Sequence, residues 1–357
     1  MKCDYFGVCG SCALALPYEE QLQKKVDEFE ELFGHRAQVF ASKPIHYRAR
    51  AEYRIAQGSY AMHRLDGAGL VAIERCPMVI EPIYDLMPKL LEAIKAKELM
   101  HKLFRIDFLS GLSGEVLATL VYHRPIDEAW EERAKEIEEE FGIKVIGRSR
   151  GVKRVLSEDF ITERLMIGAR EYRYRHYEGS FTQPNPYVNV KMIEWTLERS
   201  ENLGGDLLEL YCGAGNFTLP LSKNFGKVLA TEVSKSSIKA AKENRALNDI
   251  SNVEFVRLSS EEVSEALQGR RFRRLEGIDM SSYDFSCVFV DPPRCGLDDA
   301  TRDVIAKFEN ILYISCNPKT LHRDLQELTK THTIEHLALF DQFPYTNHLE
   351  AGVFLRR

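Results

Sequence analysis

The sequence predicts an α/β fold, in which a doubly wound, Rossmann-like domain follows an α+β domain. Two observations predict it. From about residue 190, stretches with helical periodicity alternate with short apolar runs rich in β-branched residues, which is typical of a mainly parallel sheet covered by helices. Earlier in the chain, strand-like runs follow one another with few helical stretches between them, which predicts an antiparallel sheet. The length of 357 residues suits two domains.

We divide the chain into a Cys-rich arm over residues 1–15, an α+β domain over residues 16–175, and a Rossmann-like catalytic domain over residues 176–357. The α+β domain begins with a predicted helix that has apolar residues at helical spacing and ends on Gly34. Strand-like and helical stretches then alternate, with strands expected within 46–74 and 103–123, a helix over 84–102, and a helix followed by strands over 130–156.

The catalytic domain shows the βα rhythm most clearly. Helices are expected over 190–203 and 237–248. Short apolar strands are expected within the following ranges: 206–215, 227–234, 253–260, 285–293 and 311–318. The boundary near YRHYEGSFTQPNPY, residues 174–187, is where the rhythm changes from antiparallel to alternating.

Composition is that of an ordinary globular protein, with 44% hydrophobic and 29% charged residues. No apolar run is long enough to cross a membrane, and the N-terminal residues lack a secretory signal pattern, so we expect a cytoplasmic protein with reduced or metal-bound cysteines. A net charge of −6 argues against non-specific coating of nucleic acid, although a local basic patch remains compatible with it. No obligate protein partner is inferred.

A glycine-containing turn joins a strand to a helix in DLLELYCGAGNFTLPL, residues 206–221. Glu232 ends the next strand 19 residues after Gly213 (232 − 213), a spacing typical of the carboxylate that accepts a ribose hydroxyl in nucleotide-binding βαβ units. Asn216 and Phe217 stand where a dinucleotide loop would carry its third glycine, so no pyrophosphate is expected. S-Adenosylmethionine therefore fits better than NAD, and a plain tight turn is the alternative.

Asp291 directly follows an apolar strand in FVDPPRCGLDD, residues 289–299. The two prolines stiffen a loop at the carboxyl end of the sheet, where open α/β sheets bind ligands. Methyltransferases that act on exocyclic amines resemble this motif but carry an aromatic residue after the prolines. Arg294 stands there instead, which argues against amine methylation.

Cys316 stands at the junction of a predicted strand and a predicted helix in ILYISCNPKT, residues 311–320. Asn317 suits an N-cap and Pro318 the first helical position, so the positive helix end would favour the thiolate of Cys316. A buried core thiol is an equally good interpretation of this residue alone, because free Cys is among the most buried residue types.

Six motifs resemble, in order, those of the RNA uracil-5-methyltransferases: SFTQPN, LLELYCGAGNFTLPL, VLATEVS, FVDPPRCGLD, LYISCNP and LFDQFPYTNHLE. Two N-terminal stretches, HYRARAEYRI and HKLFRIDFL, are most similar to the branch that makes 5-methyluridine in the T loop of tRNA, at tRNA position 54. The resemblance extends over nearly the whole chain beyond residue 15. It implies Cys316 as nucleophile and Glu350 as base. It also implies S-adenosylmethionine contacts at Gln183, Tyr211, Asn216, Glu232 and Asp291.

Uracil chemistry explains why such an enzyme needs a thiol. C5 is a poor nucleophile until a thiolate adds to C6 and converts C5 into an enolate carbon that can attack the methyl group. A base must then remove the C5 proton so that the thiol leaves, and the uracil must be turned out of its loop to reach both groups. His348 competes with Glu350 for the role of base by residue type, whereas the resemblance favours Glu350; a plain loop carboxylate is the alternative.

Cys295 is a rival nucleophile, because cytosine-5 DNA methyltransferases place their thiol directly after the corresponding proline motif. Here Arg294 intervenes, and Asp298 and Asp299 would oppose ionisation of the Cys295 thiol. Cys316 is therefore preferred. The two cysteines within predicted apolar strands are expected to be core residues: Cys212 and Cys287.

Three arginines alternate along one predicted strand, so they would share a face that can meet phosphate: Arg48, Arg50 and Arg54. A solvated sheet face is the alternative. The resemblance implies that Phe104 and His123 approach the T loop, where an aromatic ring can fill the space left by a displaced base. Arg294 is interpreted either as an electrostatic aid to the developing enolate or as an ion-pair partner of Asp298.

Four cysteines suggest a metal site in a reducing compartment: Cys3, Cys9, Cys12 and Cys76. The first three form C-x5-C-x2-C, and their spacing resembles the [4Fe–4S] site of the ribosomal-RNA branch of the same family. We favour the cluster over zinc, and unliganded cysteines are the third interpretation. Its expected role is structural, in that it would hold the N-terminal arm against the domain that contains Cys76.

These cysteines make ribosomal RNA the alternative substrate, whereas the other motifs favour tRNA. A non-catalytic RNA-binding or tRNA-folding protein is an alternative of another class. Cys316, Glu350 and Asp291 argue against it, because such a protein would not need them.

Overall fold

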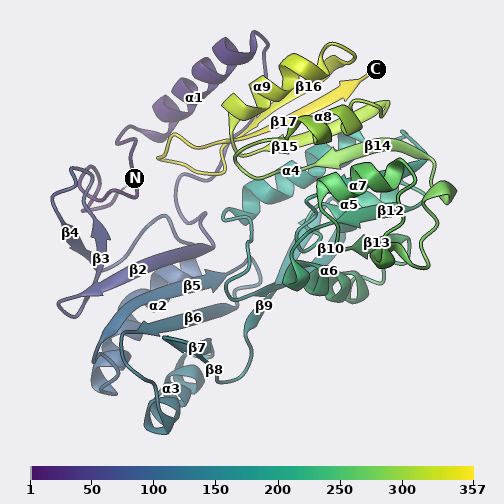
Figure 1. Ribbon diagram of the computed structural model, residues 1–357. Coiled ribbons are helices and arrows are strands. Elements are labelled where there is room, and N and C mark those ends of the chain that lie inside the picture. The colour runs from purple at the N-terminus through teal and green to yellow at the C-terminus, as the bar shows by residue number, and fades with distance from the viewer. Residues whose placement is uncertain (1) are drawn as a thin grey trace.

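Two large β-sheets organise the computed structural model, which describes residues 2–357. In Figure 1 the seven-stranded sheet of the N-terminal half lies at the lower left, and the eight-stranded sheet lies at the upper right. A two-stranded hairpin, β9 (Phe160–Ile167) and β10 (Arg170–Tyr177), runs between them. No helix within residues 2–357 is long and apolar enough to span a membrane.

The seven-stranded sheet has the order β4-β3-β2-β5-β6-β7-β8. Its strands are β2 (Arg50–Ala56), β3 (Ser59–His63), β4 (Leu70–Ile73), β5 (Leu103–Ser110), β6 (Val116–Tyr122), β7 (Lys144–Ser149) and β8 (Val152–Val155). Every pair is antiparallel, as predicted, except β6 with β7. That pair is parallel because helix α3 (Glu128–Phe141) connects the two strands as a crossover.

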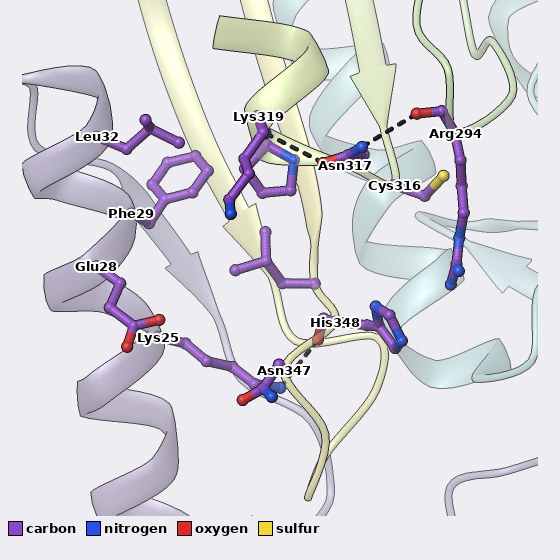
Figure 2. A pocket seen from close by; sticks show the side chains of 12 residues that line it. Lys25, Glu28, Phe29, Leu32, Arg294, Cys316, Asn317, Lys319, Asn347 and His348 are labelled. Carbon is purple, nitrogen blue, oxygen red and sulfur yellow. Dashed lines mark hydrogen bonds between the residues drawn. The ribbon is translucent and has the colours of Figure 1, made fainter. Parts of the chain in front are cut away.

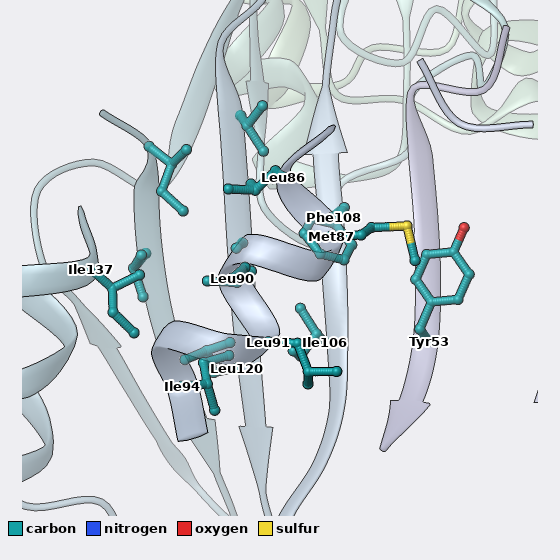
Figure 3. Close-up of a cluster of buried hydrophobic side chains, with 14 of the residues drawn as sticks. Tyr53, Leu86, Met87, Leu90, Leu91, Ile94, Ile106, Phe108, Leu120 and Ile137 are labelled. Carbon is teal, nitrogen blue, oxygen red and sulfur yellow. The ribbon is translucent and has the colours of Figure 1, made fainter. Parts of the chain in front are cut away.

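The core of this half lies between the sheet and the helices α2 (Glu81–Ala96) and α3. Apolar residues on one side of α2 are buried, among them Met87, Leu90 and Ile94. Figure 3 shows them facing side chains of the central strands such as Phe108 and Leu120. Burying each such side chain contributes about 1.5–3 kcal/mol, so this contact holds the N-terminal sheet in a fixed shape.

The eight-stranded sheet has the order β1-β16-β17-β15-β14-β11-β12-β13. Its strands are β1 (Gln38–Phe40), β11 (Asp206–Leu210), β12 (Val228–Thr231), β13 (Val253–Val256), β14 (Phe285–Val290), β15 (Asn310–Ser315), β16 (Thr333–Phe340) and β17 (Glu350–Arg356). Only β17 runs antiparallel to its neighbours. The strand order reverses at β11, which pairs with both β12 and β14, so the sheet has the switch point at which open α/β sheets bind ligands.

Helices cover both faces of this sheet, which confirms the doubly wound prediction. They are α4 (Pro186–Arg199), α5 (Thr218–Leu221), α6 (Lys235–Leu247), α7 (Ser260–Leu267), α8 (Asp299–Ile305) and α9 (Pro318–Leu328). Three short 3-10 turns complete the domain: η1 (Ser222–Asn224), η2 (Arg273–Leu275) and η3 (Met280–Ser282). The buried side chains fall into one cluster on each face.

Helix α1 (Tyr18–Phe33) and strand β1 pack with the eight-stranded sheet, although they precede the N-terminal sheet in the chain. β1 pairs parallel with β16, and Phe29 and Phe33 belong to the cluster that also contains Leu321 and Leu325 of α9. Figure 1 shows α1 beside α9. Residues 18–40 were predicted to belong to the α+β domain, whereas they contact the C-terminal sheet. The domain limits stay a prediction.

The hairpin β9–β10 contacts both halves of the molecule. On one side, Glu163 Oε1 accepts a hydrogen bond from the backbone N–H of Leu112 at 2.8 Å. On the other, the backbone N–H of Arg173 donates to Asn248 Oδ1 at 2.9 Å. These bonds tie the N-terminal sheet to the helical layer that covers the C-terminal one.

Candidate active site

Four parallel strands end at the same edge of the eight-stranded sheet, and each is followed directly by a residue that the sequence analysis singled out. Tyr211 follows β11, Glu232 follows β12, Asp291 follows β14 and Cys316 follows β15. Because the carboxyl ends of parallel strands meet at one edge, the fold gathers residues that lie far apart in sequence.

Strand β17 brings Glu350 to this edge as well. The strand is antiparallel to β15, with Ser315 paired with Ala351, so the residue that opens β17 lies beside the residue that follows β15. Cys316 and Glu350 are therefore neighbours, and the charge of Glu350 acts on the Cys316 thiol.

The start of α9 has the predicted capping. Asn317 is the N-cap, and its Oδ1 accepts a hydrogen bond from the backbone N–H of Lys319 at 3.2 Å, while Pro318 is the first helical residue. Asn317 Nδ2 and Thr320 Oγ1 both donate to the carbonyl oxygen of Arg294, at 3.1 and 3.3 Å. These bonds hold the loop after β14 against the turn that carries Cys316.

The thiol does not have the depressed pKa that the helix end predicts. Burial raises the pKa of Cys316 to about 11, the charges of Glu350 and Asp291 act in the same direction, and Arg294 acts in the opposite one. The predicted thiolate is therefore wrong for the free protein, because burial and two carboxylates outweigh one helix end. As a nucleophile, Cys316 would have to lose its proton when the substrate binds.

Two carboxyl groups next to the thiol also favour their protonated forms. Burial raises the pKa of Glu350 well above its ordinary value, and the charge of Asp291 acts in the same direction while Arg294 opposes both. Burial raises the pKa of Asp291 to about 7. Because like charges disfavour each other in a buried site, this edge retains at least one exchangeable proton near neutral pH.

A pocket of about 300 Å³ opens at Cys316. Figure 2 shows the thiol, the Arg294 side chain and the His348 ring at one end, and Lys25 and Phe29 of α1 at the other. This pocket is large enough for a pyrimidine ring, and its one cysteine is Cys316 among the residues described.

The surroundings of Cys295 and Arg294 argue against two interpretations of the sequence: Cys295 as the nucleophile, and Arg294 as the ion-pair partner of Asp298. Cys295 is exposed and does not line the pocket, and its carbonyl oxygen accepts a hydrogen bond from Arg323 at 3.0 Å. Asp298 caps α8 by accepting from the backbone N–H of Thr301 at 2.8 Å. Arg294 forms no ion pair within residues 2–357, so its interpretation as a partner of Asp298 is wrong.

Cys212 and Cys287 are buried in the core, as predicted.

The glycine-containing turn after β11 is held by the acidic residue at the end of β12. Glu232 Oε2 accepts from the backbone N–H of Gly213 at 3.2 Å, and its Oε1 accepts from Ser234 at 2.8 Å. Tyr211 has φ of 62°, a left-handed conformation that is uncommon for a bulky residue, and its hydroxyl donates to Ser260 Oγ at 3.0 Å. The strained backbone marks this turn as a candidate binding loop.

Gln183 and Asn216 form a second group at the other side of the same loop, where they line one small cavity. Asn216 exchanges two hydrogen bonds of 2.8 Å with Asn189 of α4. Gln183 Oε1 accepts from Gln342 Nε2 at 2.8 Å. Gln342 was not singled out from the sequence, although it stands in the DQFPYTN motif that was quoted.

A model of the family described as tRNA (Uracil-5-)-methyltransferase matches residues 17–357. The chain belongs to this family. It is 65% identical over its full length to a protein of a Nitratiruptor species named tRNA/tmRNA (uracil-C(5))-methyltransferase, with both chains covered completely. A Neisseria meningitidis protein of the same name is 48% identical over 95% of this chain and 97% of its own length.

The fold of this uracil-5-methyltransferase family member also matches a solved structure. The Pyrococcus abyssi tRNA (uracil-54, C5)-methyltransferase, solved in complex with S-adenosyl-L-homocysteine, superposes with a TM-score of 0.75 over 96% of this chain and 84% of that one. At 23% identity the comparison shows a shared fold.

The methyltransferase presents an aromatic and basic stack on its N-terminal sheet. The rings of Phe104 and His123 are stacked, with centroids 4.2 Å apart and planes at 18°, and the guanidinium of Arg54 lies 5.5 Å from the Phe104 centroid. Arg50 and Arg54 share one face of β2, as the alternation predicts. Arg48 precedes β2, and its Nε donates to the Arg50 carbonyl oxygen at 2.8 Å.

The cysteines predicted to bind a metal lie in one region of the molecule. Burial raises the pKa of Cys12 to about 12, and the neighbouring thiols of Cys76, Cys9 and Cys3 add to that effect. Within residues 2–357, however, no group of three or more His, Cys, Asp or Glu side chains is placed to hold a metal ion. The structure therefore shows no preformed site for a metal at these cysteines, and the cluster and its zinc alternative both stay predictions.

Proposed function

We propose that this protein methylates C5 of a uridine in tRNA, uridine 54 of the T loop, and takes the methyl group from S-adenosylmethionine. Membership of the tRNA (uracil-5-)-methyltransferase family supports the reaction. The names of full-length relatives, tRNA/tmRNA (uracil-C(5))-methyltransferase, support tRNA over ribosomal RNA, with tmRNA as a second substrate. The observation that carries the chemistry is the position of Cys316, which lines the pocket, beside Glu350 of the neighbouring strand.

The residues at the switch point fit S-adenosylmethionine, which would supply an electrophilic methyl group. We infer that Glu232, which follows β12, would accept hydrogen bonds from the ribose hydroxyls. On the far side of the loop, Gln342 Oε1 is buried without a hydrogen-bond partner among the residues described. That orphaned acceptor, next to Gln183, suits the ammonium group of the methionine part. Tyr211, Asn216 and Asp291 would complete the proposed binding site.

Cys316 begins the reaction as the nucleophile. Its thiol would lose its proton to solvent as the substrate binds, the sulfur would bond to C6 of uracil, and the C5=C6 electrons would move to form an enolate. C5 would then take the methyl group of S-adenosylmethionine, whose sulfur–methyl bond breaks as S-adenosylhomocysteine leaves. Arg294, the cation that counteracts the raised pKa of the thiol, also suits the negative charge that develops on the uracil ring. A second candidate role, phosphate contact, rests on its exposure.

Glu350 completes the reaction as the base. It takes the C5 proton, the C5–H electrons re-form the C5=C6 bond, and the C6–S bond breaks with release of the Cys316 thiolate. Glu350 must be ionised for this step. The positive charge of Arg294 favours the ionised form of Glu350, and the negative charge of Asp291 opposes it.

The stack of Arg54, Phe104 and His123 supports RNA contact by the N-terminal sheet. A flat aromatic surface flanked by a guanidinium suits an unstacked base next to a phosphate. Arg48 and Arg50 extend the basic face toward the segment that carries Gln183, since Arg50 donates to the Ser180 carbonyl oxygen at 2.5 Å. RNA bound there would lead toward the pocket of Cys316.

We retain the [4Fe–4S] cluster as a proposal for the cysteine region. A cluster would attach each of the four thiolates to a different iron and so hold the sulfurs farther apart than a single ion would. The mutual effect of the thiols on their pKa values supports their proximity.

An incubation with labelled S-adenosylmethionine tests the proposed function. Unmodified tRNA transcript should receive label in 5-methyluridine, and the same transcript with uridine 54 changed to cytidine should receive none. Label in ribosomal RNA alone would contradict the tRNA assignment. Binding of tRNA without transfer would favour the non-catalytic alternative.

A further inference from the structure

The segment between β16 and β17, residues 341–349, leads directly into Glu350 and carries His348. The chain leaves the sheet at Phe340 and re-enters it at Glu350, and these two residues are paired in the β16–β17 register. The position of the proposed base therefore depends on how this segment, which we call the base loop, is held.

One side chain from α1 binds both ends of the base loop. Lys25 Nζ donates to Asp341 Oδ1 at 2.6 Å, to the Phe343 carbonyl oxygen at 3.0 Å and to the His348 carbonyl oxygen at 3.0 Å. An ammonium group has three hydrogens, and all three are used. Figure 2 shows Lys25 reaching from the helix to the backbone beside His348.

Two further residues on the same side of α1 hold the loop. The hydroxyl of Tyr18 donates to Asp341 Oδ2 at 2.9 Å, so both oxygens of this buried carboxylate are occupied. Gln21 Oε1 accepts from the backbone N–H of Tyr345 at 2.6 Å, where the loop has a left-handed φ of 62°. Helical spacing brings Tyr18, Gln21 and Lys25 onto one face.

Stability alone is a poor explanation for Lys25. Its side chain is 3% exposed and that of Asp341 is 0% exposed, and a buried ion pair of this kind contributes little net stability compared with apolar residues of similar size. The three acceptors of Lys25 instead belong to the loop that precedes the proposed base. The ammonium group of Lys25 is costly to bury, and all three of its hydrogen bonds go to the base loop. Placement of that loop explains why the charge is buried there.

We propose that Lys25 is a positioning residue, which, with Asp341, fixes the base loop so that Glu350 can take the C5 proton of the methylated uracil. This inference rests on the proposed function. It makes the proton-removal step depend on α1. The addition of Cys316 to C6 depends on β15 and α9, with which Lys25 forms no hydrogen bond, although Lys25 lines the far end of the same pocket.

The two steps can be measured separately. RNA with 5-fluorouridine at position 54 has no C5 proton to remove, and fluorine does not leave as a cation, so the reaction stops as a Cys316–RNA adduct that carries the methyl group. Formation of this adduct reports addition and methyl transfer. Turnover of ordinary RNA also requires proton removal.

The test uses the full-length Lys25→Met variant. Its adduct formation on 5-fluorouridine RNA should stay within about threefold of the unmodified protein, while turnover of ordinary tRNA falls about a hundredfold, because a shift of the order of 1 Å in a reacting group has this effect. Ordinary tRNA should then accumulate as a methylated covalent adduct.

The matched control is Lys24→Met, which makes the same change on the preceding residue. Lys24 is exposed, and its Nζ lies 3.8 Å from Glu28 on the helix surface, so both rates should be unchanged. Lys25→Met leaves the buried Asp341 carboxylate without its cation. The double variant Lys25→Met/Asp341→Asn removes that charge and is the variant to measure if Lys25→Met alone does not fold. It should unfold at a higher temperature than Lys25→Met and still release product slowly.

Three outcomes separate the possibilities. Equal turnover for Lys25→Met and Lys24→Met would overturn the positioning role. An equal loss of adduct formation and of turnover in the double variant would overturn it too, since it would mean general damage to the site. Failure of the unmodified protein to methylate tRNA would instead overturn the proposed function.

Discussion

Cys316 and Glu350 lie next to each other because β15 and β17 are antiparallel neighbours, with Ser315 paired with Ala351. One residue follows its strand and the other opens its strand, so a thiol and a carboxyl group meet at the edge where the parallel strands end. Asp291, which follows β14, lies close enough for its charge to act on both. This arrangement suits the proposed two-step reaction, in which a nucleophile and a base act on adjacent carbons.

Glu350→Gln should separate methyl transfer from product release. Glutamine cannot accept the C5 proton, so turnover should fall about 10²–10⁴-fold, while the methyl group is still transferred. The protein–RNA adduct should accumulate and survive a denaturing gel with the label in it. His348→Ala is the control and should not trap the adduct. Normal turnover by Glu350→Gln would show that another group is the base.

The rate of adduct formation should rise with pH. Burial raises the pKa of Cys316 to about 11, so below that pH the thiolate fraction increases about tenfold per pH unit. Rates on 5-fluorouridine RNA measured from about pH 6 to 9 should therefore give a slope near one on a logarithmic plot. A flat profile over this range would mean that the thiolate already exists in the free protein.

Arg294→Gln should move the pH profile of adduct formation to higher pH. The charge of Arg294 lowers the pKa of the Cys316 thiol, which burial and the two carboxylates raise. Arg294→Lys keeps the charge and serves as the matched control, with a smaller shift expected. The measurement is the same adduct rate at saturating RNA. Identical pH profiles for Arg294→Gln and Arg294→Lys would contradict an electrostatic role of Arg294.

Phe104→Ala should weaken tRNA binding more than it slows the chemical step. Loss of stacking on one base costs about 1–3 kcal/mol, which corresponds to roughly a 5- to 150-fold weaker binding of tRNA. Adduct formation at saturating RNA should change much less. Phe160→Ala is a suitable comparison, since Phe160 is also a partly buried aromatic residue under an arginine but lies on the hairpin β9. Equal effects of both changes would argue against a specific RNA stack.

Protein purified without oxygen should be brown, with a broad absorption that fades in air, if the four cysteines hold a [4Fe–4S] cluster. Cys76→Ser should remove the colour, whereas Cys287→Ser, a change of a buried cysteine in the other half of the molecule, should not. Iron and sulfide analysis of the anaerobic protein checks the assignment. Colourless protein with its cysteines fully reactive toward a thiol reagent would contradict the cluster.

Local sequence patterns were sufficient to predict most of the fold and the residues at the edge of the eight-stranded sheet where its parallel strands end. The βα rhythm predicted the doubly wound domain, and residues that directly follow strands were recognised because period and position are properties of short segments. Strand order was not predictable in this way. The pairing of β1 with β16 joins residues nearly the whole chain apart, and nothing in the short run Gln38–Phe40 indicates its partner.

The site residues that sequence reasoning missed act through tertiary contacts. Lys25 is one of two adjacent lysines in an amphipathic helix, and only the folded structure distinguishes the buried one from the exposed one. The state of Cys316 was predicted wrongly for a similar reason. The helix end is visible in Asn317-Pro318, whereas the carboxyl groups that oppose it come from β14 and β17.

The most direct test of the account is to identify the residue that bonds to RNA. Unmodified protein, S-adenosylmethionine and tRNA containing 5-fluorouridine at position 54 should give one covalent adduct, and mass spectrometry of the digested complex should place it on Cys316. Cys316→Ala should give no adduct, and Cys295→Ala should give it at an unchanged rate, since Cys295 lies outside the pocket. An adduct mapped to Cys295, or an adduct that persists in Cys316→Ala, would contradict the account.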